Sequence, residues 1–477
     1  MKNRIITASI LFVMLSCTRD DVNLDQHATY EAIPESLVTY AEKELSDYMN
    51  TPNVNENNFR LTMQYWQEVT YVSESNYNFT NRNVSDNIWG LNYINVLNNL
   101  QKAKDLINVY QPAASEISGW EVKKKNQLAI IDMMMVYTYQ NMVDLFGNIP
   151  YSQALNNAQY QLPAYDNAAD IYASLITRLN SAIANITTGG SFGSGDVYYK
   201  GDLSKWKKFG NSLLLKLGIS LSDVNPTLAK TTITSAISGG VMTSLDDSCK
   251  FQYLSSSPNY NPIYENVFAN NRDDFFGAKP LVDFLNSTND NRVTKFFDDV
   301  DGAYIGQVVG QPGNFEDFSA PGTFAYTSTT PGNILTYTEV AFYLAEAAAR
   351  FNLGGDPKTL YDKAVSASFL EWGLTNAQAD DYLTANPFDA VNWKKSIGQQ
   401  AWVAMYNQAN VSYNFYRRLD YPVLVAPLTA ISNAEGKVPV RLQYPTLEAS
   451  TNGTNYTNAG TAIGGDKLTT KLFWDKF

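Results

Sequence analysis

The residue types that most often carry catalysis are scarce in this sequence. Its 477 residues include one histidine, His27, and two cysteines, Cys17 and Cys249. A serine or cysteine hydrolase needs a histidine beside its nucleophile, and a structural zinc ion needs four His or Cys ligands. Glycine-rich loops with the spacing of phosphate-binding or dinucleotide-binding motifs do not occur either. The sequence therefore predicts no site of these classes.

Cys17 follows a short apolar segment, residues 5–15, that is preceded by Lys2 and Arg4. As a helix this segment is about 17 Å long, too short for a hydrocarbon core of about 30 Å. It is typical of a secretory signal peptide. The sequence at its end, "MLSC" (14–17), resembles the lipobox of bacterial lipoproteins, in which the cysteine is acylated and becomes the mature amino terminus. We therefore expect a signal peptide over residues 1–16 and a lipid anchor on Cys17.

A disulfide between Cys17 and Cys249 in an exported protein is the alternative. With Cys17 acylated, Cys249 has no partner in the chain and is expected to be a small buried hydrophobic residue. Asp20 and Asp21 follow the anchor. Acids in this place resemble an export signal for the outer face of the outer membrane.

Acidic residues offer two further candidates for chemistry. Glu339 and Glu346 lie on nearly one face of an expected helix, where they could form a catalytic carboxylate pair or be held by internal ion pairs. Asp298, Asp299 and Asp301 supply hard oxygen ligands of the kind that Ca²⁺ prefers, without the spacing of an EF-hand. A solvated turn fits this cluster better. We predict no cofactor, and a structural calcium ion stays open as an alternative.

The overall charge is acidic. The formal net charge is −12, and it becomes −14 when the two basic residues of the signal peptide are lost. An acidic protein repels polyanions, so nucleic acid is not expected as a partner.

Apolar residues recur at intervals of three and four along much of the chain, which predicts amphipathic helices. Gly147 is placed to end one helix, Ser204 to cap the start of another, and Asn225-Pro226 to close it. The expected helical segments are 92–110, 123–146, 170–186, 205–226 and a hairpin over 337–373.

The hairpin carries Leu344, Ala345, Tyr361 and Ala364 at signature positions of a tetratricopeptide repeat, although an ordinary helical hairpin is the alternative. Residues 241–335 are rich in Gly, Pro, Ser and Asn and also in aromatic residues. They are expected to form long packed loops that carry function. The expected division is a helical scaffold over 25–240 and 336–405, a loop-rich insertion over 241–335, and an irregular C-terminal segment over 406–477.

Several segments, taken in order, resemble the SusD/RagB family of outer-membrane nutrient-binding lipoproteins, in its shorter RagB/SusD-like form. The resemblance runs from the lipobox to the last residue. It is carried by "DLFGNIPYSQAL" (144–155), "KWKKFGNSLLLKLGISLSDVNP" (205–226), "YTEVAFYLAEAAAR" (337–350), "NFYRRLDYPVL" (414–424), "GKVPVRLQYPTLEASTNGTNY" (436–456) and "KLFWDKF" (471–477).

The resemblance implies a mainly α fold in which tetratricopeptide-like hairpins support an irregular, loop-rich half. It also implies a lipid-anchored protein of the outer membrane, facing the cell exterior. Such a protein captures an oligosaccharide, or in some members a peptide, and passes it without catalysis to a SusC-like TonB-dependent transporter. A surface glycosidase is a less favoured alternative.

The family motifs belong to the scaffold and do not identify the ligand. Trp206 and Trp474 are expected in the core, and Arg417 and Arg418 are expected to pair with internal carboxylates. Sugar rings stack their C–H faces on aromatic rings and bond their hydroxyls to polar side chains. Two aromatic stretches fit this need, and the candidate ligand-binding residues are Trp66, Tyr71, Tyr77, Phe79, Arg82, Tyr260, Tyr264, Asn270, Arg272, Phe275 and Phe276.

Overall fold

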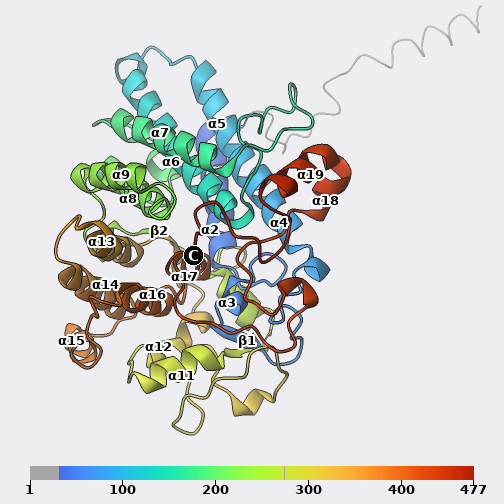
Figure 1. The fold of residues 1–477 in the computed structure, drawn as a ribbon. Coiled ribbons are helices and arrows are strands. Elements are labelled where there is room, and N and C mark those ends of the chain that lie inside the picture. Colours follow the sequence, from blue (N-terminus) through green and yellow to red (C-terminus); the bar gives the residue numbers. More distant parts are fainter. Residues whose placement is uncertain (1–31, 273) are drawn as a thin grey trace, which may run out of the picture.

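The computed structural model describes residues 32–272 and 274–477, and helices dominate it (Figure 1). The N-terminal half contains α2 (Pro34–Asn50), α3 (Phe59–Thr62), α4 (Val84–Gly90), the π-helix η3 (Leu91–Leu97), α5 (Asn98–Val109), α6 (Ile117–Phe146), α7 (Ala168–Asn185), α8 (Leu203–Ser220) and α9 (Pro226–Gly239). The C-terminal half contains α13 (Tyr337–Phe351), α14 (Pro357–Glu371), α15 (Asn376–Ala385), α16 (Trp393–Ala404), α17 (Ala409–Leu419), α18 (Thr446–Thr451) and α19 (Gly453–Ala462). The expected mainly α fold class is confirmed.

Successive helices pack as hairpins and stack along one side of the molecule. The pairs α6–α7, α8–α9 and α13–α14 follow one another down the left of Figure 1, where α16 continues the stack. The α13–α14 hairpin buries Ala345 against Tyr361 and Ala364, the residues that matched a tetratricopeptide repeat. The tetratricopeptide-like scaffold is therefore present.

Local sequence explains where these helices begin and end. Gly147 ends α6 with a φ of 86°, a value that glycine adopts readily. Asp356 accepts a hydrogen bond from the Thr359 backbone N–H at 2.8 Å and caps α14.

Two expected boundaries were wrong. Asp202, rather than Ser204, caps α8 by accepting bonds from two backbone N–H groups. Asn225-Pro226 does not close α8, which ends at Ser220. It starts α9, where proline suits the first turn and Asn225 accepts a bond from the Leu228 N–H.

The middle of the chain forms short elements, of which α11 and α12 lie below the helix stack in Figure 1. They are α10 (Pro262–Tyr264), the π-helix η6 (Glu265–Ala269), α11 (Lys279–Ser287), α12 (Val293–Phe296) and the 3₁₀ helices η5 (Leu245–Asp247) and η8 (Thr323–Tyr326). Four short strands form two antiparallel pairs, β1 (Trp66–Glu68) with β3 (Phe275–Gly277) and β2 (Cys249–Phe251) with β4 (Gly332–Leu335). Helix α11 was not expected in this region, nor were α17, α18 and α19 in the C-terminal segment.

Cys249 is fully buried in β2, and this burial raises the pKa of its thiol. Its expected role as a small buried hydrophobic residue is confirmed. Cys17, the predicted anchor, lies outside the described residues. Within the described ranges, no helix has both the length and the apolarity needed to cross a bilayer.

The carboxylate of Asp144, near the end of α6, joins distant parts of the scaffold. It accepts hydrogen bonds from Tyr172 Oη of α7 at 2.5 Å, Asn414 Nδ2 of α17 at 3.1 Å and Trp474 Nε1 near the C terminus at 2.9 Å. Gln140 donates a further bond. Trp206 and Trp474 are buried, so their predicted place in the core is confirmed.

The buried charges of the scaffold are mostly paired. Arg418 forms a two-pronged ion pair with Glu346, with contacts of 3.0 and 2.8 Å, as predicted. Arg417 differs from the prediction, because it donates to the backbone oxygens of Asp144 and Val440 rather than to a carboxylate. Glu339 pairs with the buried Lys216 at 3.1 Å. Both candidate catalytic acids, Glu339 and Glu346, are therefore held in internal ion pairs.

We predict that Asp144→Asn lowers the free energy of unfolding by at least about 2 kcal/mol, because an amide cannot accept from all the donors that converge on this carboxylate. Urea denaturation measures the change. Asp105→Asn, the same replacement at an exposed position of α5, serves as the control and should shift stability by less than about 0.5 kcal/mol. Equal stability of the two variants would contradict the role given to Asp144.

Candidate ligand-binding site

Four aromatic side chains form a partly exposed row on the loop-rich face, which we call the aromatic platform. Tyr260 and Tyr264 contact each other with ring centroids 5.3 Å apart, and Tyr264 contacts Phe268 at 5.1 Å. Phe268 in turn contacts Tyr326 at 6.1 Å. Phe268 is 54% exposed and Tyr326 is 40% exposed, whereas the two other rings are half-buried. Exposed, adjoining rings are what a sugar chain needs for stacking.

Asn261 fixes this platform in place. Its side-chain oxygen accepts a bond from the Ile263 N–H and caps α10, which carries Tyr264. Its side-chain nitrogen donates to the Thr330 carbonyl at 2.7 Å, and its backbone N–H donates to the Ser328 carbonyl. Asn261 is fully buried, so these bonds are shielded from water. They join α10 to the segment that carries Tyr326.

Two acidic residues, Glu56 and Glu265, lie near the platform. Burial raises the pKa of Glu56, and the nearby carboxylates of Asp47, Glu44 and Glu265 raise it further. Glu265 begins η6, directly after Tyr264. This acidic edge disfavours sulfated or uronate-rich ligands and is compatible with neutral ones.

Sequence reasoning found two members of the platform, Tyr260 and Tyr264, and missed the other two. Phe268 continues their four-residue spacing, and this local signal could have identified it. Tyr326 reaches the platform only through the tertiary fold, so no nearby residue pattern points to it. Asn270 is exposed just after η6, within the same short segment.

Most aromatic candidates of the first stretch proved to be core residues. Trp66 is fully buried and donates its indole N–H to Tyr406 Oη at 2.7 Å. Tyr77 is also fully buried, and Phe79 is 6% exposed. Burial prevents these three rings from stacking on a ligand. Tyr71 is 68% exposed, but no ring contact among the described residues connects it to the platform.

Two aromatic candidates of the second stretch, which lie in β3, are also core residues. Phe275 and Phe276 are buried in this strand, at 3% and 5% exposure. Their expected contact with ligand is therefore corrected to a packing role. Strand β3 pairs with β1, so that Phe275 lies opposite Glu68. The two predicted stretches are therefore in contact, but the contact is between two buried strands.

Both candidate arginines are engaged by carboxylates at this junction. Arg82 donates to Glu74 at 2.8 Å, and Arg272 donates to Asp274 at 2.9 Å. A longer contact of 3.5 Å joins Arg272 to Glu68. Arg272 is mostly buried and links Asp274 to Glu68, whereas Arg82 bonds Glu74 through Nε alone and is exposed, so its contact with ligand stays a prediction.

The calcium candidate is an exposed turn. The Asp299 carboxylate accepts a bond from the Gly302 N–H at 2.8 Å, and Asp301 has a positive φ of 52°. Across the described residues, no group of three or more His, Cys, Asp or Glu side chains is arranged to hold a metal ion.

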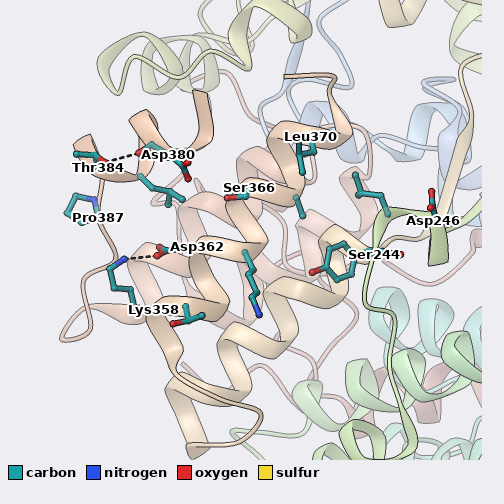
Figure 2. Close-up of a pocket in the computed structure, with 15 residues that line it drawn as sticks. Ser244, Asp246, Lys358, Asp362, Ser366, Leu370, Asp380, Thr384 and Pro387 are labelled. Carbon is teal, nitrogen blue, oxygen red and sulfur yellow. Dashed lines mark hydrogen bonds and ion pairs between the residues drawn. The ribbon is translucent and has the colours of Figure 1, made fainter. Parts of the chain in front are cut away.

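A larger cavity, of about 880 Å³, lies on the scaffold between α14, α15 and η5 (Figure 2). Tyr337 is the one aromatic residue among those that line it. Lys358 pairs there with Asp362 at 2.6 Å, and none of the candidate ligand-binding residues faces the cavity. It offers no stacking surface comparable with the platform.

We predict that the buried Glu68 makes stability fall with rising pH. Burial, aided by the charge of Glu74, raises the pKa of Glu68 to about 8. The folded state therefore keeps a proton that the unfolded chain loses above its ordinary pKa of about 4.3. This contribution to stability is complete below about pH 4.3 and is lost as the pH rises toward 8.

Glu68→Gln should remove this dependence, which reaches at most about 1.4 kcal/mol per pH unit. The variant should gain stability relative to the wild type as the pH rises from 5 to 8, measured by urea denaturation at each pH. The exposed Glu316→Gln is the control. A stability difference between Glu68→Gln and the wild type that stays constant over this range would refute the assignment.

Comparisons with known proteins agree with this fold. The chain is similar to a chitin-binding protein of known structure, with 27% identity and a TM-score of 0.80 over 93% of this chain and 100% of that one. It is also similar to a SusD homologue from Bacteroides uniformis, with 24% identity and a TM-score of 0.77 over 92% and 99% of the two chains. A chitin-binding SusD homologue from Flavobacterium johnsoniae has 23% identity and a TM-score of 0.77 over 93% and 98%.

A search among curated proteins gives no match. The model of the SusD-like family described as "Starch-binding associating with outer membrane" matches residues 26–445. This match spans most of the sequence, and the chain belongs to the SusD-like family.

Proposed function

We propose that this protein captures a neutral oligosaccharide at the outer face of the outer membrane and passes it to a SusC-like TonB-dependent transporter. The platform of Tyr260, Tyr264, Phe268 and Tyr326 is the capture surface. The protein binds and releases the glycan without breaking a bond, and a lipid on Cys17 keeps it at the membrane.

The observation that carries this proposal is the exposure of contiguous rings on short turns that the buried hydrogen bonds of Asn261 hold in place. Aromatic side chains of this size are normally buried, and Phe268 is more than half exposed. The rings contact one another edge to face or tilted, and a sugar ring can stack on the exposed face of any one of them.

Two further observations support a neutral glycan. Glu265, which directly follows Tyr264, and the nearby Glu56 are acidic and disfavour anionic ligands. The similar protein with 27% identity is described as chitin-binding, and chitin is an uncharged polymer. N-acetylglucosamine oligomers are therefore the first ligands to test.

We predict that Phe268→Ala weakens binding of chitohexaose at least tenfold, or about 1.4 kcal/mol, because it removes the most exposed ring of the row. Calorimetry on the mature chain measures the affinity, and the melting temperature should change little. Tyr40→Ala removes a ring of 45% exposure from α2 and is the matched control.

A glycan and peptide array on the wild type comes first and selects the oligosaccharide for this titration if chitohexaose does not bind. Binding of peptides alone would turn the proposal toward the peptide-capturing alternative. Unchanged glycan affinity in Phe268→Ala would remove the platform as the capture surface. Steady release of shortened glycans by the purified protein would contradict a role without catalysis.

We also predict that Cys17 carries fatty acyl chains in the mature protein. Mass spectrometry of the N-terminal peptide from cell membranes should show at least two chains, since a single chain anchors a protein only marginally. Cys17→Ala should move the protein from the membrane fraction to the soluble fraction. A free Cys17 thiol on a secreted protein would contradict the anchor.

A further inference from the structure

A small cavity of about 200 Å³ lies where the last residues of α14 and α16 meet strands β2 and β4. We call it the α14–α16 cavity. The residues that matter for its chemistry are Lys250, Phe324, Asn333, Glu371, Trp372 and Asn407. Cavities for drug-sized ligands run from about 300 to 1,000 Å³, so this one suits a single ring rather than a chain.

Two buried amides offer unused hydrogen-bonding groups to the cavity. The backbone N–H and carbonyl of Asn333 both bond to Asn50, but its side-chain amide has no partner among the described residues. Asn333 is 9% exposed. The side-chain oxygen of Asn407 accepts from Arg60 at 2.8 Å, whereas its NH₂ group has no acceptor in the described part of the chain. The unpaired atoms of both amides are accessible from the cavity rather than sealed from water, so water or a polar ligand can bond them there.

The two charged side chains that line the cavity, Lys250 and Glu371, are paired with each other. Lys250 Nζ lies 2.7 Å from Glu371 Oε1, and Thr338 donates to the other oxygen of Glu371 at 2.6 Å. An ionic ligand would find no unpaired counter-charge there. The cavity therefore favours a neutral ligand.

Aromatic rings complete the wall of the cavity. Trp372 and Phe324 meet edge to face with centroids 5.3 Å apart. Amides that can donate and accept, set beside aromatic carbon, match a polyhydroxylated ring, which has polar edges and apolar C–H faces.

The cavity and the platform share one structural support. Phe324 and Tyr326 both belong to η8, so this single turn supplies a cavity wall and a platform ring. Thr330 also lines the cavity, and its carbonyl accepts the bond from Asn261 that fixes the platform. A ligand at one site is therefore adjacent to the segment that builds the other.

We propose that the α14–α16 cavity is a subsite for one neutral sugar ring, the terminal residue of the oligosaccharide that stacks on the platform. This inference rests on the proposed function and adds a second contact. The end of the glycan enters the cavity, bonds Asn333 and Asn407, and packs on Trp372. Such a subsite would select chains by the identity of their last residue.

Monosaccharides test the cavity through the Asn333 variants, because a ring that stacks only on the platform does not contact Asn333. Ligand-detected NMR titrations of the wild type would use glucose, galactose and N-acetylglucosamine as probes. At least one should bind. Asn333→Leu removes the amide and fills space, and should weaken that binding at least tenfold, whereas Tyr40→Ala, outside both sites, should leave it unchanged.

Asn333→Ala removes the amide without adding bulk, so it tests the same contact if the leucine variant is unstable. Asn180→Leu, the same replacement at an exposed position of α7, is the matched control. Melting curves confirm that each variant is folded.

The outcomes separate the subsite from the general function. Loss of monosaccharide binding in both Asn333 variants, but not in Asn180→Leu, supports the subsite. Equal monosaccharide affinity in the wild type and the Asn333 variants overturns it. Failure of all three monosaccharides to bind a protein that binds an oligosaccharide also overturns it and leaves the platform intact. Failure of every oligosaccharide in the array to bind overturns the proposed function instead.

Discussion

The hydrogen bonds to Asp144 are the contact on which the scaffold depends. Donors from α6, α7, α17 and the C-terminal segment converge on one buried carboxylate, and the Arg417 guanidinium binds the backbone oxygen of the same residue. Burial raises the pKa of Asp144, while the bond from Tyr172 and the charge of Arg417 act in the opposite direction. Residues separated by most of the chain length are thereby held together, and the hairpin stack is closed against the last residues of the sequence.

Much of this scaffold could be predicted from sequence because its signals are local. Apolar spacing located α6, α7, α8 and the α13–α14 hairpin, and Gly147 marked a true helix end. The errors arose where two local signals competed. Ser204 and Asp202 are both good caps, and Asn225-Pro226 can either follow one helix or start the next. Helix α11 was missed because it is short and lies within a segment whose composition indicates loops.

The candidate site was harder to predict, since exposure is a property of the tertiary fold. Tyr260 and Trp66 lie in equally aromatic stretches, yet the first is half-buried at the platform and the second is fully buried in β1. No local pattern distinguishes them. The same difficulty applies to charged residues. The sequence does not show that Arg82 and Arg272 are each paired with a carboxylate, because these pairs depend on the tertiary fold. The cavity amides Asn333 and Asn407 come from segments far apart in the chain.

The platform is carried by α10, η6 and η8, which are each a single short turn, whereas the hydrogen bonds of Asp144 join the long helices α6, α7 and α17 to the C-terminal segment. Short turns held by one buried amide can change their side chains without disturbing the stacked hairpins. Replacement of the exposed rings Phe268 and Tyr326 can therefore change the proposed capture surface, while Asn261 and the packed Phe324 keep the turns in place. The same separation makes these two positions suitable for engineering a new ligand preference onto an unchanged scaffold.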